Sequence, residues 1–92
     1  MSTLFSFEMQ VNDIFQLSVG RTVFVGEIIG SNYVKKCECV IKVPGENDIA
    51  VTIDGEDILC GKKNDLRAIS TRDKLDIERL KKFAGSLRII GK

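Results

Sequence analysis

Three cysteines are the most reactive side chains in this 92-residue chain. Cys37 and Cys39 are separated by one residue, so on a β-strand both sulfur atoms would lie on one face. Together with Cys60 they offer three thiolates to a metal. Structural zinc sites, however, use a fourth strong ligand and cysteine pairs spaced more widely around a turn. We therefore interpret the cysteines as core thiols and predict no metal and no cofactor.

A second group with catalytic chemistry is the carboxylates Asp54, Glu56 and Asp57, which flank Gly55. Hydrolytic carboxylate pairs need a cleft that raises one pKa, and these side chains are expected in a solvated turn. The sequence has no histidine, which excludes histidine general bases and histidine-ligated metals. The stretch ending at Lys63 has glycine spacing unlike a phosphate-binding loop. We predict no catalytic residues and no enzymatic activity.

Four basic residues are the candidate partner-binding residues: Lys62, Lys63 and Arg67 around one loop, and Arg21 at an earlier connection. The chain has 14 Lys and Arg against 13 Asp and Glu, a net charge of +1. Because a general polyanion binder carries a strong basic excess, a protein partner is favoured over RNA, which would be contacted only locally. The alternative is that these charges lie at strand ends and prevent edge pairing.

The elements that must position these residues are mostly strands. Alternating apolar residues over 4–11 and 14–19 predict two strand segments joined by a bend or bulge at Asn12-Asp13. Further strands are expected over 22–29, 33–43, 48–53, 56–60, 66–69 and 86–90. The spacing of the apolar residues then changes from strand-like to helical, which predicts one helix over about 72–84, capped by Ser70 or Thr71.

This pattern is typical of a mainly β protein, with residues 1–92 in a single domain. We predict a small closed antiparallel β-barrel of about six to seven strands with one C-terminal helix. One core is expected to contain Phe7, Met9, Val11, Phe15, Val23, Val25, Cys39, Ile41 and Val51.

Residues 7–30 read FEMQVNDIFQLSVGRTVFVGEIIG. They follow an F-x-M-x-[IV]-x-D-[VI]-[FY]-x-I stretch, with Leu17 in its last position, and then T-V-x-x-G-x-[VI], with Thr22 nine residues after Asp13. This segment resembles the start of the second, β-barrel domain of elongation factor Tu and related translation GTPases. That family usually has glycine where Arg21 stands. The resemblance implies a barrel whose loops lie against RNA in translation factors, and it implies no activity of its own.

We therefore expect a non-enzymatic binding module that recognises a protein, or an RNA, through its barrel loops. The alternative is an immunity (antitoxin) protein or a translation-factor mimic that neutralises a cognate partner. The sequence contains no long apolar run and no basic signal-peptide start, so we expect no membrane contact and a cytoplasmic location. An unpaired edge strand at either terminus would also allow a homodimer.

Overall fold

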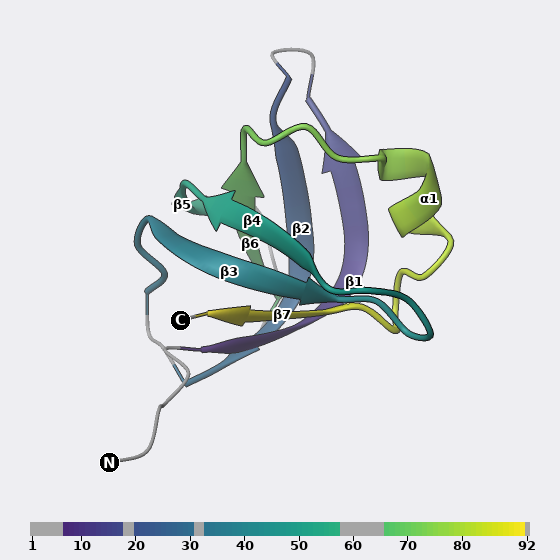
Figure 1. The fold of residues 1–92 in the computed structure, drawn as a ribbon. Helices are drawn as coiled ribbons and strands as arrows, with labels where there is room; N and C mark the ends of the chain where they lie inside the picture. Colours follow the sequence, from purple (N-terminus) through teal and green to yellow (C-terminus); the bar gives the residue numbers. More distant parts are fainter. Residues whose placement is uncertain (1–6, 18–19, 31–32, 58–65, 92) are drawn as a thin grey trace.

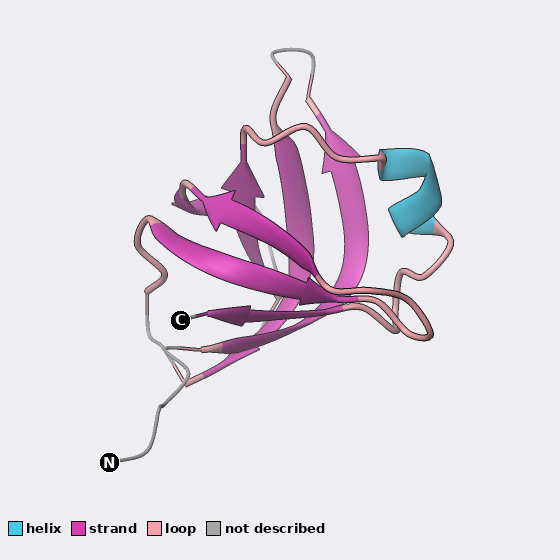
Figure 2. Cartoon of the chain, in the orientation of Figure 1, coloured by secondary structure: helices cyan, strands magenta, loops and turns pink. Residues whose placement is uncertain are grey.

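Seven antiparallel strands form one sheet that curls into a nearly closed barrel (Figure 1). The computed structural model describes residues 7–17, 20–30, 33–57 and 66–91. The sheet order is β4-β3-β7-β1-β2-β6-β5. Its strands are β1 (Glu8–Gln16), β2 (Thr22–Ile29), β3 (Cys37–Lys42), β4 (Ile49–Ile53), β5 (Gly55–Asp57), β6 (Arg67–Thr71) and β7 (Arg88–Gly91). One short helix, α1 (Ile77–Lys81), precedes β7 (Figure 2). The predicted fold class is confirmed.

The barrel closes because β4 and β5 are consecutive strands separated by a sharp corner. Gly55 adopts φ +152° at this corner, a conformation that favours glycine. β4 pairs with β3, whereas β5 pairs with β6, so the corner joins the two ends of the sheet. The Asp54 backbone N–H donates to Ser70 O at 2.7 Å, and the Thr71 hydroxyl donates to Thr52 O at 2.5 Å.

β1 contains a β-bulge at the position where a bend was predicted. Val11 lies opposite Gly26, but the next pair is Asp13 with Val25, which leaves Asn12 as the extra residue. β1 approaches β2 so closely here that a Cβ on Gly26 would lie 1.8 Å from the Gln10 carbonyl oxygen. A glycine is therefore required opposite the bulge.

The bulge reverses which side chains of β1 face the core, and this overturns part of the predicted core. Ile14 is fully buried, while Phe15 is 46% exposed on the outer face. Phe24 of β2 packs in the main core, so its neighbours Val23 and Val25 point outward. Placing Phe15 inside was wrong, because an extra residue in a strand inverts the alternation after it. Val23 and Val25 are buried, but in a second cluster and not with the predicted core.

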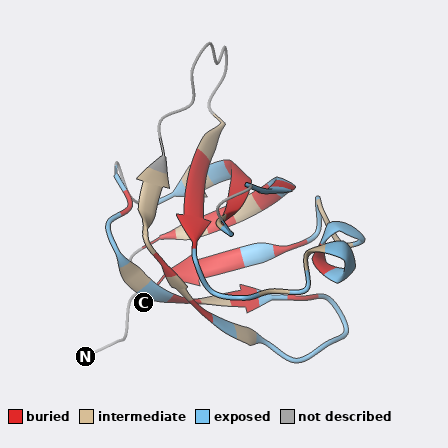
Figure 3. Ribbon diagram, turned by 90° about the horizontal axis from the view of Figure 1, so that it is seen from above, coloured by how far each residue is buried: buried red, intermediate tan, exposed pale blue. Residues whose placement is uncertain are grey.

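The remaining predicted core residues do pack together inside the barrel. Phe7, Met9, Val11, Cys39, Ile41 and Val51 belong to one buried cluster. Leu80 joins this cluster from α1, whose other surface is largely exposed (Figure 3). Among the described residues, no helix has the length and apolar character needed to cross a membrane.

The helix is much shorter than the predicted range of 72–84. Asp73 uses its carboxylate to accept the Thr52 backbone N–H of β4 at 2.7 Å, which holds the chain beside that strand instead of in a helical turn. The helix begins only after Asp76, whose side chain accepts from Arg79 N at 3.2 Å and caps it. Beyond Lys81 the chain continues through turns. The predicted caps, Ser70 and Thr71, lie in β6.

Candidate functional site

Part of the outer face of β1, β2 and β6 is apolar, although Asp13 lies opposite Val25 and Ser70 opposite Val23 on the same face. Phe15 of β1 lies directly opposite Val23 of β2, and Val25 lies opposite Ala68 of β6. Val23, Val25 and Ala68 form a second cluster, separate from the main core, with Leu66 packed against it. We call this surface the outer patch; it comprises Phe15, Leu17, Val23, Val25, Leu66 and Ala68.

The outer patch has a shielded centre and a raised, exposed edge. Val23 and Val25 are each only 8% exposed and Ala68 is fully buried, although all three point away from the core. Phe15 and Leu17 are 46% and 43% exposed. Phe15 on β1 and Leu17, directly after the end of β1, therefore stand beside a floor of smaller apolar side chains. They are the part of the patch that a partner would contact first.

Arg21 supplies the polar end of the outer patch. Its backbone carbonyl accepts the Leu17 N–H at 2.7 Å, so Arg21 lies across the β1–β2 connection from Leu17. Its guanidinium donates to the Ser70 hydroxyl at 2.6 Å. The predicted site residue Arg21 is thus next to the patch and is held in place from β6.

Beyond the bulge, no strand among the described residues pairs with β1 on the side away from β2. β7 pairs with β1 only over Glu8–Gln10, and Leu87 O accepts the Val11 N–H at 3.0 Å. Farther along β1, the Ile14 N–H donates to the Asp13 carboxylate at 2.8 Å. This carboxylate covers part of the exposed edge. A homodimer through an edge strand stays a prediction.

Arg67, another predicted contact residue, is part of the barrel structure. Its guanidinium donates two hydrogen bonds of 2.7 Å to the Glu56 carboxylate, and the Val34 N–H donates to the same group at 3.0 Å. The two charged side chains are only 21% and 13% exposed. The hydrogen bond from Arg67 lowers the pKa of Glu56, and Glu56 raises the pKa of Arg67.

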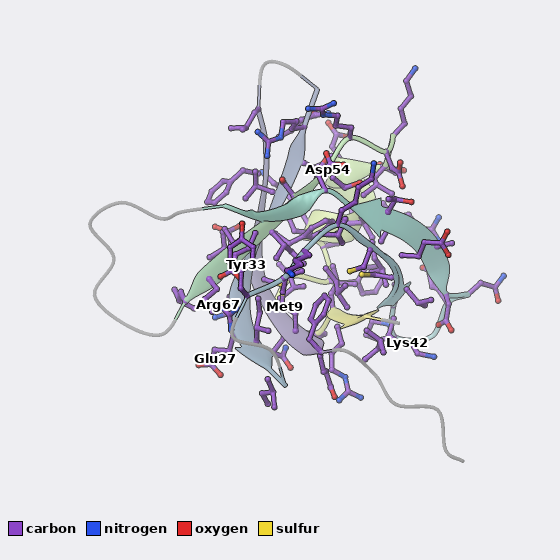
Figure 4. The ribbon with its side chains drawn as sticks, turned by 90° about the vertical axis from the view of Figure 1, so that its left-hand side faces the viewer. Met9, Glu27, Tyr33, Lys42, Asp54 and Arg67 are labelled. Atoms are coloured by element: carbon purple, nitrogen blue, oxygen red, sulfur yellow. The ribbon has the colours of Figure 1, made fainter. Side chains whose placement is uncertain are left out.

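Arg21 and Arg67, the two predicted contact residues that the structure describes, do not lie together. Thr22 pairs with Thr71 and Gly26 with Arg67, so Arg21 and Arg67 lie at opposite ends of the β2–β6 pair. At about 3.3 Å per residue, the ends of this pair are roughly 13 Å apart. Figure 4 labels Arg67 on the flank of the barrel that also carries Tyr33. Lys62 and Lys63 lie outside the described residues.

Two of the three carboxylates predicted in a solvated turn, Asp54 and Glu56, are instead paired with arginines. Asp54 lies 3.4 Å from Arg72 Nε, and Glu56 bonds to Arg67. The side chain of Asp57 lies outside the described residues. Within the described ranges, no three His, Cys, Asp or Glu side chains gather as metal ligands. Asp54 and Glu56 are therefore structural groups, and their ion pairs help to hold the barrel closed between β4 and β6.

Sequence reasoning missed the exposure of Phe15 and Leu17 because it continued the alternation of 4–11 into the next segment. The signal that could have revealed it was the predicted bulge at Asn12-Asp13, since one extra residue moves Phe15 to the opposite face. The Glu56–Arg67 pair carries no local signal, because it depends on the pairing of β5 with β6.

No family model matches the chain, and no curated protein or solved structure matches it. The similarity of residues 7–30 to translation-factor barrels therefore stays a prediction from the residues themselves. The case for function depends on the outer patch.

Proposed function

We propose that this chain is a non-enzymatic binding module that docks a folded protein partner on the outer patch. The observation that carries the proposal is the exposure of Phe15 and Leu17 next to the apolar cluster of Val23, Val25 and Ala68. Large apolar side chains that lie together on a surface mark interaction sites, whereas scattered single ones do not. Aromatic residues, phenylalanine among them, are also enriched in protein–protein interfaces.

Charge favours a protein over an RNA as the partner. The net charge is +1, and Arg21, the cation placed beside the patch, already donates to Ser70. An RNA site needs several cations along the phosphate backbone. The exposed ridge of Phe15 and Leu17 instead suits an apolar pocket or groove in a partner. Arg21 would then add a polar contact at the rim, where such residues tune specificity.

The test compares two substitutions of exposed apolar residues on neighbouring strands. Phe15→Asp places a charge in the outer patch. Ile29→Asp is the matched control, because Ile29 is 74% exposed and lies at the far end of β2. Each variant is used for affinity capture with quantitative mass spectrometry, and the retained protein is then purified and titrated against the chain by calorimetry.

We expect a partner that the wild type and Ile29→Asp retain and that Phe15→Asp binds at least tenfold more weakly, since a central hot-spot residue contributes about 2 kcal/mol or more. Binding should change little between low and moderate salt, unlike RNA binding. A partner that binds Phe15→Asp normally but is lost from the double variant Lys62→Glu, Lys63→Glu would contradict the proposal and support docking through the basic loop.

A further inference from the structure

The sulfur atoms of Cys37 and Cys39 lie 3.5 Å apart on the inner face of β3. Cys37 lies opposite Ile53 and Cys39 opposite Val51. Both Val51 and Ile53 belong to the main core. Cys39 is buried, at 1% exposure, whereas Cys37 begins the strand and is half-buried. One thiol is thus near the barrel surface and the second lies directly behind it.

This separation suits two bonds to a single soft atom. Two thiolates bonded at about 2.3 Å to a tetrahedral centre lie about 3.8 Å apart. The sulfur atoms of Cys37 and Cys39 therefore need to move by only a few tenths of an ångström, which side-chain rotation can supply. Neither of the two forms a disulfide. A centre with a narrower angle between its bonds, such as pyramidal trivalent arsenic, requires even less movement.

The ligand set around this pair is incomplete among the described residues. In the part of the chain that the structure describes, no third His, Cys, Asp or Glu joins the two sulfurs to complete a ligand set. A site with two sulfur ligands suits a three-coordinate atom that arrives with its third ligand already bound. Thiolates also select soft centres over hard ones such as magnesium or calcium.

We propose that Cys37 and Cys39 form a chelating dithiol that captures a soft, thiol-seeking centre of the trivalent arsenic class. In the capture step two S–H bonds break and two arsenic–sulfur bonds form. The two protons leave with the oxygen that was bound to arsenic, as one molecule of water. Arsenic stays trivalent throughout, so the step needs no oxidant or reductant.

The test uses phenylarsine oxide, which carries one phenyl group on trivalent arsenic. A Cys60→Ser background removes the third thiol, and Cys37→Ala and Cys39→Ala in that background are the matched single-thiol variants. Cys37→Ala is the milder change because Cys37 is half-buried. Circular dichroism confirms that each variant is folded, and Cys37→Ala carries the comparison if Cys39→Ala does not fold.

We expect native intact-mass spectrometry to show one phenylarsenic group on the Cys60→Ser chain. A monothiol should fail to remove it, and a 1,2-dithiol should release it. Both single-thiol variants should lose the stable adduct. The probe should also raise the melting temperature of Cys60→Ser and leave that of the Cys37→Ala variant unchanged, because a ligand that binds the folded state stabilises it.

Three results would overturn this inference: no adduct on the Cys60→Ser chain, a stable adduct on the Cys37→Ala variant, or a fall in melting temperature when the probe is added. The last result would mean that the probe binds the unfolded chain. None of these measurements involves the outer patch, so the dithiol inference and the proposed function succeed or fail separately.

Discussion

Gly26→Ala should strongly destabilise the barrel, because it places a methyl group where β1 and β2 approach most closely. The new Cβ would lie 1.8 Å from Gln10 O, and contacts under 3.0 Å are essentially never seen. β1 must therefore retreat by about 1.2 Å, the difference between those two distances. Ladder hydrogen bonds of about 2.9 Å would lengthen to about 4 Å and be lost.

The expected loss follows from these contacts. Two or three broken ladder bonds cost about 1 kcal/mol each, and the forced shift of packed side chains adds about 1–3 kcal/mol. Gly26→Ala should thus cost about 3–6 kcal/mol. A domain of this length has a free energy of unfolding of about 5–14 kcal/mol. The melting temperature should fall by at least about 12 °C, since each kcal/mol corresponds to about 4–8 °C.

Urea denaturation followed by circular dichroism measures this loss. Gly45→Ala is the control, because Gly45 has φ +73° but nothing lies within 4 Å of its added Cβ. That variant is subject only to conformational strain, about 1–2 kcal/mol. If Gly26→Ala unfolds at the same urea concentration as the wild type, the bulge does not bring the two backbones together as described.

Two further predictions concern the core register and the ion pair at the barrel closure. Phe24→Ala should lower the free energy of unfolding by about 3–5 kcal/mol in urea denaturation, and Phe15→Ala by less than about 1.5 kcal/mol, because only Phe24 is fully buried. Equal losses would contradict the register. The lowered pKa of Glu56 means that its contribution to stability is present above the unfolded pKa, near 4.5, and is lost as the pH falls through the folded value. Relative to Glu56→Gln, the wild type should lose its advantage during acid titration, and parallel stability profiles would exclude this role.

Much of the sheet could be predicted from the sequence because its signals are local. Alternation, the Pro44-Gly45 turn and the Asp54-Gly55 corner each involve residues close together in the chain. The bend at Asn12-Asp13 was predicted as well, and the structure places a bulge there. What could not be predicted was the direction of the alternation beyond the bulge, because a bend and a one-residue bulge leave the same local pattern but opposite faces for Phe15.

The features that sequence missed depend on partners distant in the chain. The helix was expected to start near Asp73, whose charge suits a first turn. In the fold, Thr52 of β4 offers that carboxylate an unpaired backbone N–H, and the helix starts later. The same holds for Arg67, which was expected to be available to a partner. In the fold, the pairing of β5 with β6 places Glu56 beside it.

The position of β7 has a consequence for how the barrel folds during synthesis. β7 is the last strand of the sequence, yet it lies between β3 and β1, with Ile89 opposite both Met9 and Ile41. The β1–β2 and β3–β4 hairpins can form while the chain is still being made, but they cannot join until residues near 91 leave the ribosome. Pairing of residues so far apart gives the chain a high contact order, and such chains fold slowly, in milliseconds to seconds. A nascent barrel would therefore expose its unpaired β1 edge to chaperones until β7 has been synthesised.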